Sequence, residues 1–168
     1  MSKKTLLLTL FLAATSASSQ ATVYLLSGAM DPFQATTNPG NTGNGSGNIS
    51  GMYDDATKLL NYSIDWVDLT SLVTNMHFHA GAPGVPGGVD LGIPGPWSSP
   101  EIGSNITLNP SQEANLLGGN WYVNIHTQNF GGGEIRGQVN VAQIPEPSSS
   151  LLSLSGVSLL LLPRRRSS

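Results

Sequence analysis

The stretch Leu60-Asn61-Tyr62-Ser63-Ile64-Asp65-Trp66 indicates the fold class, because its apolar and polar side chains alternate strictly. The leucine, tyrosine, isoleucine and tryptophan fall on one side, and the asparagine, serine and aspartate fall on the other. Successive side chains of a β-strand point to opposite sides, whereas those of an α-helix repeat about every 3.6 residues. The stretch therefore predicts a half-buried strand within the range 58–69.

The same alternation recurs in two later segments. In the range 72–80 apolar residues oppose two histidines, and in the range 121–127 the apolar side is formed by Trp121, Val123 and Ile125. Segments rich in Gly, Pro and Asn separate these stretches and read as loops. Further short strands are expected at 23–27, 48–53, 89–93, 105–108 and 134–142.

A single helix is expected over Pro110–Leu117. Asn109 before Pro110 is typical of a helix start, and Gly118-Gly119 is typical of a helix end. Many short strands with one helix of about two turns predict an all-β fold. We expect a single antiparallel β-sandwich of Ig-like or Greek-key type.

Composition excludes several classes of function. The chain has 168 residues and no cysteine, so it has no disulfide, no thiolate nucleophile and no cysteine zinc site. The range 22–144 holds two basic and nine acidic side chains, which gives it a net charge of −7. Such a surface repels phosphate backbones, so we expect no nucleic-acid partner.

Residues 1–21 have the features of a secretory signal peptide. Lys3 and Lys4 precede an apolar run over 6–14, and Ser19-Gln20-Ala21 is a small-x-small cleavage site. The apolar run is too short for a bilayer core of about 30 Å. We therefore expect an exported protein with its domain over residues 22–144.

Residues 145–168 contain three parts in a fixed order. Pro145-Glu146-Pro147 comes first, an apolar run over 151–162 follows, and Arg164-Arg165-Arg166 lies near the end. This order resembles the PEP-CTERM sorting signal, which bacterial exosortases recognise and cleave. The resemblance implies an exosortase partner, transient membrane association through this segment, and a final place at the cell envelope surface or in the extracellular matrix. The alternative is a C-terminal tail anchor, which the shortness of the apolar run disfavours.

Six motifs stand out in the range 23–141: Leu26-Ser27-Gly28-Ala29, Leu59-Leu60-Asn61-Tyr62-Ser63-Ile64, Met76-His77-Phe78-His79-Ala80-Gly81, Leu116-Leu117-Gly118-Gly119-Asn120, Tyr122-Val123-Asn124-Ile125-His126-Thr127 and Gly133-Glu134-Ile135-Arg136-Gly137-Gln138. Together they resemble the CHRD domain, a module of chordin and of many secreted bacterial proteins. The family has no agreed enzymatic activity. The resemblance therefore implies an architecture and a location rather than a mechanism.

All three histidines of the chain lie in these motifs. His77 and His79 share one side of their strand, about 6 to 7 Å apart at Cα. Glu134 and Arg136 share a side by the same rule, so neighbouring strands would gather both with His77, His79 and His126 in one polar cluster.

Two interpretations of this cluster remain open. A His-x-His pair with a third histidine is a candidate zinc or copper site. Alternatively, Glu134 and Arg136 pair while the imidazoles bridge the strands through hydrogen bonds. We favour the second interpretation, because His-x-His alone is a loose motif.

Other candidate chemistry is weaker. The chain has no Gly-x-Ser-x-Gly motif, and Asp54-Asp55 is more typical of a turn than of a catalytic pair. The His-x-His-x-Gly run resembles copper–zinc superoxide dismutase, but this chain has too few histidines for that two-metal site. Among the tryptophans, only Trp97 is expected to be exposed.

These observations predict a non-enzymatic binding or structural module at the bacterial surface or in its matrix, with no catalytic residue and no required cofactor. Exopolysaccharide or surface proteins are its expected partners. The alternative is a copper- or zinc-binding protein or oxidoreductase that uses His77, His79 and His126.

Overall fold

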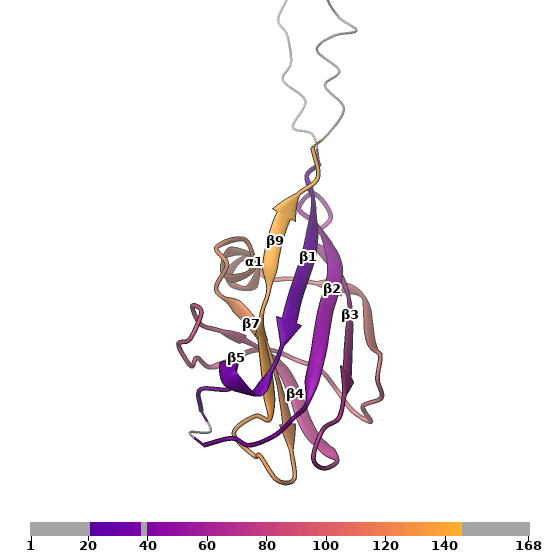
Figure 1. Ribbon diagram of the computed structural model, residues 1–168. Coiled ribbons are helices and arrows are strands. Elements are labelled where there is room, and N and C mark those ends of the chain that lie inside the picture. The colour runs from indigo at the N-terminus through magenta and orange to yellow at the C-terminus, as the bar shows by residue number, and fades with distance from the viewer. Residues whose placement is uncertain (1–20, 38–39, 146–168) are drawn as a thin grey trace, which may run out of the picture.

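The computed structural model describes residues 21–37 and 40–145. Within these ranges, nine strands form two antiparallel sheets that pack face to face (Figure 1). The predicted all-β sandwich with one short α-helix is confirmed. Of the two predicted targeting signals, only Ala21 and Pro145 fall inside the described residues.

The first sheet has the strand order β6-β3-β2-β1-β9. Its strands are β1 (Val23–Met30), β2 (Ser46–Asp54), β3 (Leu59–Val67), β6 (Glu101–Thr107) and β9 (Asn140–Gln143). The alternating stretch identified in the sequence forms β3, where Leu60, Tyr62 and Ile64 are buried. Trp66 is partly buried and packs against the edge of the same core.

The second sheet has the strand order β5-β4-β7-β8. Its strands are β4 (Val73–Ala80), β5 (Val89–Gly92), β7 (Trp121–Thr127) and β8 (Ile135–Gln138). The core lies between the two sheets. There the ring of Phe78 meets Tyr62 edge-on at 5.1 Å and stacks on Trp121 at 4.8 Å between centroids.

The predicted helix is α1 (Pro110–Leu117). The Asn109 side chain accepts from the amides of Ser111 and Gln112, and the Gln112 side chain accepts from the amide of Asn109. This capping box satisfies amides that have no partner within the helix. A 3₁₀ turn, η1 (Pro32–Gln34), follows β1. Among the described residues, no helix is both long and apolar enough to cross a membrane.

The single strand expected over 134–142 is wrong. The chain there forms β8 and β9, which lie in different sheets. Val139 lies between these strands, where the chain crosses from the second sheet to the first. It is buried, and its amide donates to the carbonyl of Trp121. Alternation along the chain shows which side chains are buried, but it does not show which sheet each half of the segment joins.

The first and last described strands run side by side (Figure 1). Tyr24 of β1 pairs with Gln143 of β9, and the amide of Ile144 donates to the carbonyl of Val23. The chain therefore enters and leaves the sandwich at the same end.

Candidate functional site

The three histidines lie together on the outer side of the second sheet. Strands β4 and β7 are hydrogen-bonded neighbours, and their register pairs His77 with Asn124 and Asn75 with His126. Met76, Phe78, Val123 and Ile125 alternate with these residues and are fully buried in the core. The apolar side of each strand therefore fixes the direction in which the histidines point.

The three imidazoles form a compact group. The ring of His77 lies 5.4 Å from that of His79 and 5.2 Å from that of His126, centroid to centroid. One ring nitrogen from each histidine lies within 4.8 Å of the others. The structure thus brings the three histidines together.

Backbone carbonyls set the tautomers of two of these rings. Nδ1 of His79 lies 3.0 Å from the carbonyl oxygen of Gly87, and Nδ1 of His126 lies 2.9 Å from that of Gly131. A carbonyl oxygen only accepts, so we assign the proton of each neutral ring to Nδ1 and the lone pair to Nε2.

Two ring nitrogens of the group are buried without a hydrogen-bond partner: Nδ1 of His77 and Nε2 of His79. Buried polar atoms normally have partners, and those that lack one call for an explanation. In addition, Nε2 of His126 has only a long contact of 3.4 Å with Nδ2 of Asn124. The hydrogen bonds of His79 and His126 go to loop carbonyls and to Asn124 of the same strand as His126, not across the strands as we favoured from the sequence.

The surroundings hold two of the imidazoles in the neutral form. Burial lowers the pKa of His77, and the neighbouring His126 and His79 lower it further. Burial also lowers the pKa of His79, since its hydrogen bond to Gly87 only partly offsets the effect of burial and of the charges of His126 and Arg136. Neutral imidazole is the form that binds a metal ion.

A second layer of residues holds His79 in place. Its ring stacks on Tyr122, and the guanidinium carbon of Arg136 lies 3.4 Å from the centroid of the Tyr122 ring. The same guanidinium donates to the carbonyls of Ala82 and Val85. Arg136 therefore ties the loop over 81–88, which supplies the Gly87 carbonyl, to the sheet.

The predicted pairing of Glu134 with Arg136 is wrong, and Glu134 does not join the histidines. Its buried carboxylate accepts from the Thr70 amide (2.7 Å), the Thr70 hydroxyl (3.0 Å) and the Thr127 hydroxyl (2.7 Å). Glu134 precedes β8, and Gly133 before it has a φ of +121°, a conformation that favours glycine. Strand β8 begins only after Glu134, so the strand alternation assumed from the sequence does not include this residue.

The histidines offer a donor set that suits zinc or copper. Catalytic zinc sites of the three-histidine type leave the fourth position for another ligand, and imidazole also suits copper. Zinc–nitrogen bonds of 2.0–2.1 Å place tetrahedral ligands about 3.3 to 3.4 Å apart. From separations of at most 4.8 Å, each nitrogen has to move inward by less than about 1 Å.

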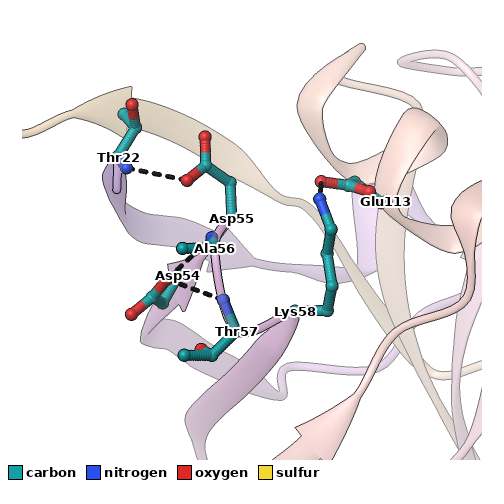
Figure 2. Close-up of polar contacts among 7 residues, drawn as sticks. All are labelled: Thr22, Asp54, Asp55, Ala56, Thr57, Lys58 and Glu113. Carbon is teal, nitrogen blue, oxygen red and sulfur yellow. Dashed lines mark hydrogen bonds and ion pairs between the residues drawn. The ribbon is translucent and has the colours of Figure 1, made fainter. Parts of the chain in front are cut away.

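Two weaker candidates have structural roles. Asp54 is the last residue of β2, directly before the turn that contains Asp55, and its Oδ1 accepts from the turn amides of Ala56 and Thr57 (Figure 2). Trp97, expected to be exposed, is half-buried and donates from Nε1 to the carbonyl of Ile93. Trp97 and Trp66 line a groove of about 570 Å³ to which none of the three histidines contributes.

Three groups that orient the histidines were not predicted from the sequence: the Tyr122 side chain and the carbonyls of Gly87 and Gly131. Tyr122 could have been found, because it lies on the same side of β7 as His126. The carbonyls of Gly87 and Gly131 could not, since every residue carries a carbonyl and only the folded loops bring these two to the imidazoles.

Comparison with known proteins gives a family. The sequence matches the CHRD domain over residues 15–139, which is most of the chain. Neither a curated relative nor a solved structure matches it. Because the match extends over β1 to β8 and includes all three histidines, the chain belongs to the CHRD domain family.

Proposed function

We propose that this protein is an exported, non-enzymatic binding module of the bacterial surface or matrix, and that it holds one zinc or copper ion through His77, His79 and His126. Membership of the CHRD family supports a binding or structural module. The metal site is the alternative that the sequence left open beside the favoured hydrogen-bonded network, and the geometry of the three imidazoles supports it.

The observation that carries the metal proposal is the pair of orphaned ring nitrogens. Nδ1 of His77 and Nε2 of His79 are buried, unpartnered, and part of a group of three imidazoles. Leaving such atoms unpaired costs about 1 to 3 kcal/mol each. A metal ion bound by these lone pairs removes that cost, and metal-binding histidines commonly donate their other N–H to a backbone carbonyl, as His79 and His126 do.

The surroundings of the histidines support binding rather than catalysis. Within the described residues, no carboxylate joins the three imidazoles as a general acid or base. The carboxylate proposed from the sequence, that of Glu134, is bonded to Thr70 and Thr127 instead. An oxidoreductase is the competing function, and redox turnover by the copper-loaded protein would support it.

The experiment for the metal site is retention of metal after dialysis. The chain from Thr22 onward, purified without metal, is loaded with Zn²⁺ or Cu²⁺, dialysed, and assayed for bound metal and for Tm. We expect one ion per chain and a higher Tm, since an ion at 100 times its Kd stabilises the native state by about 2.7 kcal/mol.

Variants locate the ion. His77→Ala, His79→Ala and His126→Ala should each lose the retained metal and the rise in Tm. Asn75→Ala is the matched control, because Asn75 is exposed on the same strand and carries no imidazole. A Tm that zinc and copper leave unchanged, with no metal retained, would contradict the metal site.

Export and sorting make up the other half of the proposal. The order of Pro145-Glu146-Pro147, an apolar run and Arg164-Arg165-Arg166 supports cleavage by an exosortase-type enzyme after transient membrane association. Strand β1 begins and β9 ends at the same end of the sandwich. This end is therefore where the sorted protein would be attached to the cell surface. Intact mass of the native surface protein should show a chain that begins at Thr22 and ends near Pro147, and a chain still ending at Ser168 would contradict sorting.

A further inference from the structure

Both backbone polar groups of Thr22 are bonded to Asp55. The backbone nitrogen of Thr22 donates to Oδ1 of Asp55 at 2.7 Å (Figure 2), and the carbonyl of Thr22 accepts from the amide of Asp55 at 3.1 Å. Thr22 immediately precedes β1, and Asp55 lies in the turn after β2. This contact therefore joins the start of β1 to the β2–β3 turn.

The peptide bond before Thr22 is the one that the signal-peptide motif marks for cleavage. Hydrolysis adds one water across that bond, so that Ala21 leaves with a carboxylate and Thr22 keeps an amine. A free α-amino group has an ordinary pKa of about 7.7 to 8.0 and is protonated at neutral pH. Cleavage thus converts a neutral N–H donor, already placed against Asp55, into a cation.

Asp55 has no basic side chain as a partner in the described part of the chain. Lys58 forms an ion pair with Glu113 at 2.6 Å (Figure 2), and the guanidinium of Arg136 lies over Tyr122. These are the two basic side chains of the range 22–144. The adjacent Asp54 uses its carboxylate to accept from amides of the turn.

We propose that cleavage after Ala21 creates an ion pair between the α-ammonium group of Thr22 and Asp55. Hydrogen bonds between charged groups are stronger than those between neutral ones, so the exported chain holds β1 more firmly than its precursor does. Strand β1 lies between β2 and β9. Fixing the residue before β1 therefore stabilises its pairing with both neighbouring strands of the first sheet. The inference rests on the export half of the proposed function and is independent of the metal site.

A double-mutant cycle tests the pair. The chain from Thr22 to Ser168 is prepared with a free and with an acetylated N-terminus, each with Asp55 and with Asp55→Asn. Acetylation keeps an N–H donor and removes the charge, while asparagine keeps an acceptor oxygen and removes the opposite charge. We expect acetylation to lower Tm by about 2 to 4 °C with Asp55 and by less than about 1 °C with Asp55→Asn.

The control is Asp54→Asn, which neutralises the neighbouring carboxylate and should leave the full effect of acetylation in place. Equal effects of acetylation with Asp55 and with Asp55→Asn, or no effect in either, would overturn the ion pair. N-terminal sequencing of the native protein separates this failure from a failure of export. A new terminus other than Thr22 would also overturn the inference, whereas an uncleaved Met1 would contradict export itself.

Discussion

The imidazole of His79 and the phenol ring of Tyr122 stack nearly parallel, with centroids 5.0 Å apart and an angle of 9° between the rings. The two residues face each other across β4 and β7, and the Tyr122 hydroxyl also binds the loop residue Gly87. Because the Gly87 carbonyl also accepts the hydrogen bond from Nδ1 of His79, Tyr122 supports the ring both directly and through the loop.

Tyr122→Phe should weaken zinc binding at the proposed metal site while it preserves the stack. The phenyl ring still covers His79, but the bonds from the hydroxyl to Gly87 are lost. Residues that orient metal ligands typically change affinity by about 10- to 100-fold when mutated. We expect a drop of about 10-fold in affinity for zinc, measured by competition with a chelating dye, and a stability loss of about 1 kcal/mol. Unchanged affinity would show that the hydroxyl does not position His79.

The metal-free protein should lose stability as the pH falls below about 6.5. The pKa values of His77 and His79 are lowered by burial in the folded state, so the unfolded chain binds protons first. Stability is complete above the unfolded value near 6.5 and declines through the window between that value and the lower folded values. Denaturant melts between pH 7.5 and 5.5 measure this, and His77→Gln with His79→Gln should flatten the dependence.

Val123→Asp should destabilise the sandwich by several kcal/mol. Val123 is fully buried between the sheets, so aspartate there places a charge in the core without a partner. Asn75→Asp is the control, because its exposed side chain keeps the oxygen that accepts from the Met76 amide. Similar thermal melts for the two variants would contradict the orientation of the second sheet.

Glu134→Gln should destabilise the protein by about 2 kcal/mol without altering metal binding. Both carboxylate oxygens of Glu134 accept hydrogen bonds, from Thr70 and Thr127, and an amide offers one acceptor oxygen and a donor in their place. Hydrogen bonds to charged groups contribute about 1.5 to 3 kcal/mol. Chemical denaturation checks the stability, and loss of zinc binding in this variant would place Glu134 in the site after all.

Local patterns in the sequence were sufficient for the fold class. The alternation in β3, β4 and β7 predicts strands with one buried side, since the burial of alternate residues follows from strand geometry alone. The helix over Pro110–Leu117 was predicted with its correct ends, because a capping box and two glycines are local signals. The presence of His77 and His79 on one side of a strand was predictable in the same way.

Only the tertiary structure decided which residues meet. His126 is 47 residues beyond His79 in the sequence and joins it because β4 and β7 pair in one particular register. The turn at Gly133 and the crossing at Val139 remove Glu134 from the histidines and divide the last segment between two sheets. Strand partners and register depend on contacts between distant residues, and the period of a single strand is the same whichever neighbour it acquires.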